Sequence, residues 1–424
     1  MTQGPIKHLR WYIAGLLCLA SALNYLDRQT LSVLIGGIKE QLYLDNADYG
    51  RINAWFLASY GVMYAVSGRV IDLVGTRLGF MIFVTGWSVA NMLHMFATTA
   101  GQFGAFRFLL GIFEPGSFTG GVRAVVEWFP MAERALAIGI FNAGTAVGSM
   151  ISAPLVSLIA VQFGWRPAFL VTGALGLVWV GGWWFFYQLP SRHPRITPSE
   201  QALLVPGKSE APAPERVSLG RLLRMRETWG CILVRGLTDP ISYFLLFWIP
   251  LYFEKRHGFA LKQIGLFVWI PFAAAALGSV VSGALPRWFI GRGWTLDRSR
   301  KTTMSLMTVL LFLGAVSTPL VANAGLALGL VATMTFCHAG WGNIILPAEV
   351  FPTHVVATVT GLGGTLGSWM GALSQIYIGR VVDALGFTPI FMACALLYPV
   401  ALLLVFQMVG QLGTVRIIPA SREI

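Results

Sequence analysis

The chain alternates long apolar segments with short polar ones from end to end. A helix needs about 20 apolar residues to cross the hydrocarbon core of a bilayer, and twelve segments approach that length. We therefore predict an all-α membrane protein with twelve transmembrane helices. The predicted spans are residues 11–34, 53–73, 79–99, 101–125, 136–159, 167–187, 229–252, 263–285, 302–320, 324–346, 356–378 and 387–410.

One long polar stretch, residues 188–228, separates the sixth span from the seventh. It contains six prolines and seven basic residues, a composition typical of a linker. We expect it to be partly disordered, with a short amphipathic helix around Leu219–Met225. The predicted organisation is an N-terminal six-helix half (1–187), a linker (188–228) and a C-terminal six-helix half (229–424).

The placement of charge predicts the topology. Only 11% of the residues are charged, against about 25% in a soluble domain. The net charge of +12 could indicate nucleic-acid binding, but most basic residues fall in alternate loops, which would be cytoplasmic if the N-terminus is. Because cytoplasmic loops are enriched in Lys and Arg, we expect both termini and the linker to be cytoplasmic.

The sequence contains no sign of a resident cofactor. Its cysteines are scattered through apolar runs, without the close spacing of a zinc site or a disulfide framework. No nucleotide-binding loop or nucleophile motif is present. We expect no metal and no cofactor, and the protein should not be an enzyme.

Six ionisable residues lie inside predicted spans, where each charge costs about 2.5–3.5 kcal/mol on insertion scales. Three are acidic and three are basic, so they can pair. Such charges usually face an aqueous cavity, and the pattern indicates a path for an anion with carboxylates that carry protons. The six are Asp27, Arg28, Arg107, Glu114, Arg235 and Asp239.

Helical spacing restricts the pairing of these residues. Arg107 and Glu114 are seven residues apart, about 10.5 Å along one helix face, so each needs a partner elsewhere. We expect Asp27 to pair with Arg107, so that Arg28 faces the cavity. Glu114 is then either a proton carrier or the partner of Arg28 or Arg235 in a structural ion pair.

Span 7 carries the corresponding groups of the second half. Arg235 and Asp239 are four residues apart, so they either pair with each other or supply a second arginine to the anion site. Pro240 should break or kink the helix. Uncharged side chains that fit a sugar-like ligand, although each could instead serve packing, are Tyr60, Tyr64, Asn142, Thr145, Tyr243 and His338.

An internal repeat supports the two-half layout. Gly68-Arg-Val-Ile-Asp72-x-x-Gly75 recurs as Gly379-Arg-Val-Val-Asp383-x-x-Gly386. The predicted topology puts the copies on opposite membrane faces, as expected if each half contains inverted three-helix repeats. The alternative is a chance similarity between glycine-rich helix ends.

These features together resemble the major facilitator superfamily. The motifs Asn24-Tyr-Leu-Asp-Arg28, Arg107-Phe-Leu-Leu-Gly-x-x-Glu114 and Glu127-Trp-Phe-Pro-x-x-Glu-Arg134 are similar to those of its anion:cation symporters, most of all the bacterial hexuronate transporters. The resemblance implies that Arg28 contacts the substrate carboxylate. It also implies that Asp27 and Glu114 take up protons, with Arg107 coupled to Asp27. Tyr25 and Tyr64 match positions that touch the sugar, and Thr145 favours the hexuronate subgroup.

We therefore expect a monomeric, multi-pass protein of the inner (cytoplasmic) membrane that co-imports a hexuronate, such as galacturonate or glucuronate, with protons by alternating access. Its partners would be the organic anion, protons and the lipid bilayer, without nucleic acid. One alternative is a permease or exchanger for an aldonate, dicarboxylate or aromatic acid. Another is a membrane sensor that does not transport.

Overall fold

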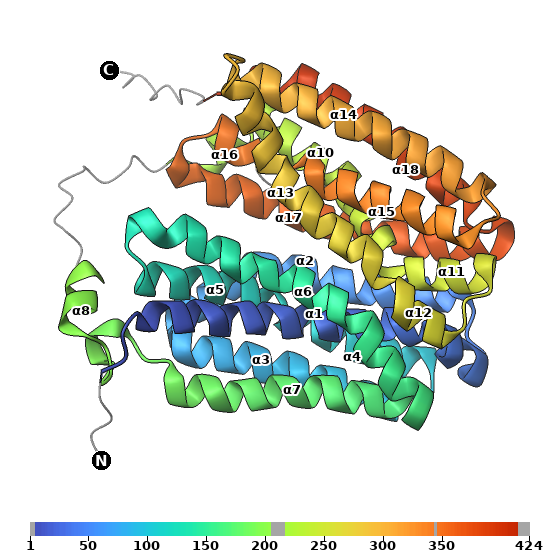
Figure 1. The fold of residues 1–424 in the computed structure, drawn as a ribbon, viewed down its shortest axis with the longest axis horizontal. Coiled ribbons are helices and arrows are strands. Elements are labelled where there is room, and N and C mark those ends of the chain that lie inside the picture. Colours follow the sequence, from blue (N-terminus) through green and yellow to red (C-terminus); the bar gives the residue numbers. More distant parts are fainter. Residues whose placement is uncertain (1–4, 205–216, 343–345, 414–424) are drawn as a thin grey trace. The chain divides into compact units, whose positions relative to one another are not determined.

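The computed structural model describes residues 5–204, 217–342 and 346–413 (Figure 1). Within these ranges the regular secondary structure is helical throughout. The longer helices are α1 (Leu9–Leu42), α2 (Asn46–Val74), α3 (Thr76–Leu93), α4 (Ala100–Phe113), α5 (Pro115–Trp128), α6 (Met131–Phe163), α7 (Trp165–Phe186), α10 (Arg226–Phe247), α11 (Ile249–His257), α13 (Trp269–Ile290), α14 (Leu296–Ser317), α15 (Ala324–Trp341), α17 (Thr353–Leu385) and α18 (Thr388–Leu404). The shorter ones are α8 (Pro198–Leu204), α9 (Leu219–Leu222), α12 (Leu261–Phe267) and α16 (Leu346–Val350).

Each predicted span coincides with one helix or with two consecutive helices. In the described ranges, nine helices or helix pairs are long and apolar enough to cross a membrane; the three remaining positions are α2, the α4–α5 pair and α17. The linker contains α8 and α9, of which α9 covers only the start of the predicted amphipathic helix. Disorder was expected in part of residues 188–228, and of these residues 205–216 lie outside the described part of the chain.

Pro115 divides the fourth span into two helices, α4 and α5, a division that we did not predict. Span 4 divides at Glu114, because Pro115 has no amide hydrogen to donate to the preceding turn. In span 7 the helix does not break at Pro240, because α10 continues through that residue to Phe247, and the alternative of a kink stays a prediction. A membrane helix tolerates an internal proline where neighbouring groups satisfy the freed carbonyl.

The chain forms two compact units. Unit 1 contains Met1–Ala211, Tyr243–Ala273 and Ala372–Phe387, and unit 2 contains Pro212–Ser242, Ala274–Gly371 and Thr388–Ile424. In unit 1, α1 packs against α6, α2 against α4 and α3 against α7. In unit 2, α14 packs against α15 and α18 (Figure 1). Two segments of the predicted C-terminal half thus group with the N-terminal residues, and the predicted boundaries at 187 and 228 stay a prediction.

Both copies of the repeat end a helix, but only the second is tightly packed. Gly75 after α2 and Gly386 after α17 have φ of 82° and 72°, a backbone region that favours glycine. Asp383 accepts hydrogen bonds from the first amides of α2, those of Asn46 (3.2 Å) and Ala47 (2.9 Å). The corresponding aspartate of the first copy, Asp72, is half exposed and pairs with Arg123.

Candidate functional site

A buried ion pair joins two of the predicted residues. The Nε and Nη2 atoms of Arg28 on α1 lie 2.8 and 2.6 Å from Oε2 of Glu114, at the α4–α5 junction. Only 4% and 0% of the two side chains are exposed. Of the alternatives for Glu114, the structure contains the ion pair with Arg28, so Arg28 has a protein carboxylate beside it.

Aromatic rings surround the same guanidinium. The Arg28 Cζ atom lies 4.5 Å from the ring centre of Tyr25, 4.9 Å from that of Tyr60 and 5.3 Å from that of Phe56. Tyr64 follows one turn later on α2, with its ring centre 6.0 Å from that of Tyr60. Two predicted tyrosines, Tyr25 and Tyr60, therefore lie at Arg28, where their ring faces attract the cation, and Tyr64 lies next to Tyr60.

Close packing of α4 on α2 brings Glu114 to this place. A Cβ atom on Gly111 would lie 2.2 Å from Ser59 Oγ and 2.3 Å from the Phe56 carbonyl oxygen, so only glycine fits. The Ser59 hydroxyl donates to the Phe108 carbonyl of α4 at 2.8 Å. Glycine at position 111 thus lets the two backbones approach, one turn before Glu114.

The expected direct pairing of Asp27 with Arg107 is wrong. Among the described residues, Asp27 Oδ1 accepts a hydrogen bond from Asn91 Nδ2 (2.6 Å) instead. Arg107 donates from Nη2 to the Arg28 carbonyl oxygen (3.0 Å), and within this part of the chain its buried Nε and Nη1 have no hydrogen-bond partner. The rotation of α1 about its axis decides the outcome, because it presents the Arg28 carbonyl rather than the Asp27 carboxylate to Arg107.

Unit 2 contains its own arginine–aspartate pair. Arg235 donates from Nε (3.0 Å) and Nη2 (2.8 Å) to Asp239 Oδ2, as the four-residue spacing allows. Two glycines of α17 leave room for the pair: a Cβ atom on Gly363 would lie 3.0 Å from Arg235 Cδ, and one on Gly367 would lie 2.1 Å from Asp239 Oδ2.

Of the other predicted side chains, Tyr243 lies close enough to Tyr60 to interact with it electrostatically. The ring centres of Tyr243 and Phe247 are 6.0 Å apart in a stacked arrangement. The Thr145 hydroxyl donates to the backbone carbonyl of Asn142 (2.8 Å), whose side chain is exposed. His338 is half-buried in unit 2, where its Nδ1 atom is hydrogen-bonded to the Tyr398 hydroxyl.

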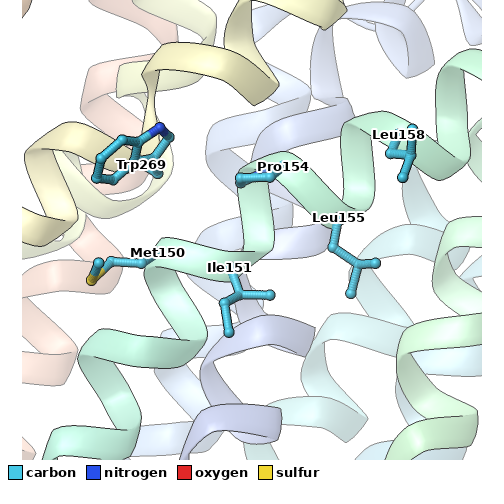
Figure 2. Close-up of a pocket in the computed structure, with 6 residues that line it drawn as sticks. All are labelled: Met150, Ile151, Pro154, Leu155, Leu158 and Trp269. Atoms are coloured by element: carbon cyan, nitrogen blue, oxygen red, sulfur yellow. The ribbon is translucent and has the colours of Figure 1, made fainter.

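The hollow shown in Figure 2 is a poor anion site. Five residues of α6 and Trp269 line a volume of about 420 Å³, and none of them is charged. Its lining would not compensate the lost hydration of a carboxylate. In the described ranges there is also no group of three or more His, Cys, Asp or Glu side chains that could hold a metal ion.

A second charged cluster joins the N-terminus to the linker. The Glu200 carboxylate accepts hydrogen bonds from the Leu9 and Arg10 amides, both at 3.0 Å, and from Arg10 Nη1 at 2.8 Å. Arg10 Nε also donates to Glu133 at 2.8 Å, and this hydrogen bond lowers the pKa of Glu133. The cluster ties the starts of α1 and α6 to α8. Sequence inspection did not single out Arg10 or Glu200 for this role.

The comparisons with known proteins agree with this fold. The family model described as Major Facilitator Superfamily matches residues 17–375. The chain is 34% identical to the hexuronate transporter of Escherichia coli (strain K12) over 96% of this chain and 93% of that protein. It is 35% identical to the galacturonate transporter of Dickeya chrysanthemi over 67% of this chain and 83% of that protein.

A solved structure has the same architecture. It is the inward-facing, unoccupied crystal structure of a bacterial homologue of the human lysosomal transporter Spinster, with a TM-score of 0.78 and 17% identity over 95% of this chain and 98% of that one. At that identity the likeness concerns the fold alone. Taken with the family match, it identifies a multi-pass membrane transporter rather than an enzyme, and the chain belongs to the major facilitator superfamily.

Proposed function

We propose that this protein is a proton-coupled symporter that imports a sugar acid, a hexuronate such as galacturonate or glucuronate, across the inner membrane by alternating access. The names of the relatives support the substrate class. The distribution of Lys and Arg supports cytoplasmic termini and a cytoplasmic linker. The observation that carries the proposal is the buried Arg28–Glu114 pair inside a ring of aromatic side chains.

The pair provides a physical route to coupling. A substrate carboxylate and the Glu114 carboxylate compete for the same guanidinium, and the planar fork of arginine fits either one. A proton on Glu114 removes its charge and releases Arg28 for the substrate. The proton-loaded protein then binds the anion better, and this difference in affinity is what coupling requires.

The remaining residues have supporting roles in this proposal. Tyr25, Tyr60 and Tyr64 present ring faces and hydroxyl groups to a hydroxylated ring, as sugar binding requires. Asp27 also takes up and releases protons, and the positive charge of Arg107 is coupled to the charge state of Asp27. Arg235 and Asp239 belong to the anion path in the second half, and the further substrate contacts proposed are Asn142, Thr145, Tyr243 and His338.

The test is galacturonate and glucuronate uptake into liposomes that contain the purified protein, with and without an inward proton gradient. Accumulation above equilibrium should require the gradient. Arg28→Ala should abolish uptake while the protein still folds. Glu114→Gln should abolish gradient-driven accumulation but retain substrate exchange, because glutamine resembles the protonated acid. Gradient-driven accumulation by Glu114→Gln would exclude Glu114 from coupling.

A second substrate class comes from more distant relatives. The chain is 27% identical to a D-galactonate transporter and 26% identical to a probable galactarate/D-glucarate transporter of Escherichia coli strains. If the wild-type protein takes up neither hexuronate, the same assay with aldonates, aldarates and aromatic acids tests the alternative of a permease or exchanger for another organic anion.

A further inference from the structure

A neutral amide, rather than a cation, holds the carboxylate of Asp27. Asp27 Oδ1 accepts from Asn91 Nδ2 of α3 at 2.6 Å, and both side chains are buried. Within the described residues, Asp27 Oδ2 has no hydrogen-bond partner and no ion pair includes Asp27. The two acids of the site therefore differ, because Glu114 lies against an arginine and Asp27 does not.

The surrounding acceptors fix the orientation of the Asn91 amide. Its Nδ2 atom lies 2.6 Å from Asp27 Oδ1, 2.8 Å from Thr172 Oγ1 and 3.4 Å from the Phe169 carbonyl oxygen. A backbone carbonyl and an ionised carboxylate can only accept, so the amide nitrogen must face them. One amide hydrogen serves Asp27, and the other serves Thr172 and Phe169 on α7.

We infer that Asn91, held in place by Thr172, is a positioning residue for the protonation and deprotonation of Asp27. This inference rests on the proposed function. The amide of Asn91 has no ionisable proton at physiological pH. It can donate to Oδ1 whether Asp27 is charged or neutral, so it keeps the carboxyl group in one orientation. The proton is then taken up and released at Oδ2, the oxygen that has no hydrogen-bond partner among the described residues.

The charged and titratable groups near Asp27 come from three elements. Arg28 is its neighbour on α1, Arg107 and Glu114 come from α4 and the junction that follows it, and His94 follows α3. His94 Nδ1 lies 2.9 Å from the Ala90 carbonyl oxygen and 3.2 Å from that of Asn91. None of these groups ion-pairs with Asp27, although the positive charge of Arg107 favours its charged form. The hydrogen bond from the Asn91 amide also favours the charged form, and Thr172 contributes beside it.

The test is the pH dependence of gradient-driven uptake. Asn91→Ala removes the donor, so Asp27 should keep its proton to higher pH. The half-maximal pH should then move upward by about one unit or more, the size expected for one hydrogen bond to a charged group. Thr172→Val should move it in the same direction by less. Ser88→Ala is the matched control, because Ser88 is also buried on α3 but does not contact Asp27, and its profile should match the wild type.

An unshifted profile in a folded Asn91→Ala protein would overturn the inference. If that variant does not fold, an unshifted Thr172→Val protein would do the same. In an Asp27→Asn background, Asn91→Ala should add no shift, and an added shift would show that Asn91 acts on another group. A wild-type protein without pH-dependent uptake would reject the proposed function as well, whereas a pH-dependent wild type with an unshifted variant rejects the inference alone.

Discussion

Arg28 and Glu114 meet through a single carboxylate oxygen. Both nitrogens of the guanidinium reach Glu114 Oε2, at 2.8 and 2.6 Å, while Oε1 is buried and has no hydrogen-bond partner in the described part of the chain. The oxygen that is free to take a proton is therefore not the one bound to the arginine. Protonation of Oε1 therefore does not require that Arg28 first leave Oε2.

The planar guanidinium of Arg28, and not only its positive charge, should contribute to substrate binding. Arg28→Lys retains the cation but loses one of two parallel hydrogen bonds to a carboxylate. We expect the KM for substrate to rise about 10- to 100-fold, the equivalent of one charge-assisted bond. Arg51→Lys is the control, because Arg51 is 52% exposed and its ion pair with Asp48 should contribute little. An unchanged KM in Arg28→Lys would remove the bidentate contact from the mechanism.

Two glycines of α17 should respond differently to alanine. A Cβ atom at Gly367 would lie 2.1 Å from Asp239 Oδ2, whereas one at Gly361 has nothing within 4 Å. We expect Gly367→Ala to destabilise the protein by about 1–3 kcal/mol and to impair uptake, because the Arg235–Asp239 pair must shift. Gly361→Ala should leave uptake unchanged and be neutral or slightly stabilising, because alanine favours a helix. Thermal unfolding and liposome uptake measure the two effects, and equal behaviour of the variants would contradict the packing at Asp239.

The repeat offers a second matched comparison. A Cβ atom on Gly379 would lie 2.3 Å from the Asn46 carbonyl oxygen, but at the equivalent Gly68 the nearest atom is a Thr119 methyl at 3.8 Å. Gly379→Ala should therefore lower the stability of this conformation by about 1–3 kcal/mol. Gly68→Ala should be neutral or slightly stabilising, because alanine favours a helix. Thermal unfolding separates the variants, and the opposite order would show that the second copy is not tightly packed.

Acid should weaken the contacts among the linker and the starts of α1 and α6, which include the Arg10–Glu133 pair. Arg10 lowers the pKa of Glu133, so the stability gained from that pair is complete at neutral pH and is lost as protons bind the carboxylate. Burial lowers the pKa of His193, which is seated between the Phe186 carbonyl and the Arg195 amide, so the folded state resists its protonation. We expect protease cleavage of the linker to increase as pH falls below about 6.5, the ordinary histidine value.

Two variants check the origin of this acid sensitivity. Glu133→Gln should reduce the increase in linker cleavage at the lower pH values. His193→Phe should reduce the increase nearer neutral pH. Equal cleavage of the wild-type protein at pH 7.5 and pH 4.5 would refute the prediction.

Most of the fold could be predicted from the sequence, because a long apolar span is recognised without reference to its neighbours. In the described ranges nine of the twelve predicted spans meet that criterion. The pairing inside the bundle was harder to predict. Spacing along one helix offered the Arg235–Asp239 pair as one of two alternatives, and the structure contains this local pair. Asp27 and Arg107 lie on different helices, and their pairing depends on rotations about the helix axes that a single sequence does not encode in any simple pattern.

Asn91 illustrates a second limit. A neutral amide in an apolar span costs less than a charge and looks like any interhelical hydrogen-bonding residue. The available signal was its isolation in span 3, between Ala90 and Met92, and this did not indicate a partner 64 residues earlier. Likewise, Pro115 and Pro240 look equivalent in sequence, yet only the first divides its helix.

The Glu200 carboxylate has a consequence for how the protein is made. It binds the first amides of α1, although it lies 191 residues after Leu9. During synthesis, α1 is therefore complete before the residue that binds its first amides has been made. A fragment that stops at the predicted boundary, residue 187, omits that carboxylate, whereas one that continues to Leu204 includes α8 and the contact. The α8 segment of the linker thus belongs with unit 1, and the start of α1 acquires these contacts only after synthesis has passed residue 187.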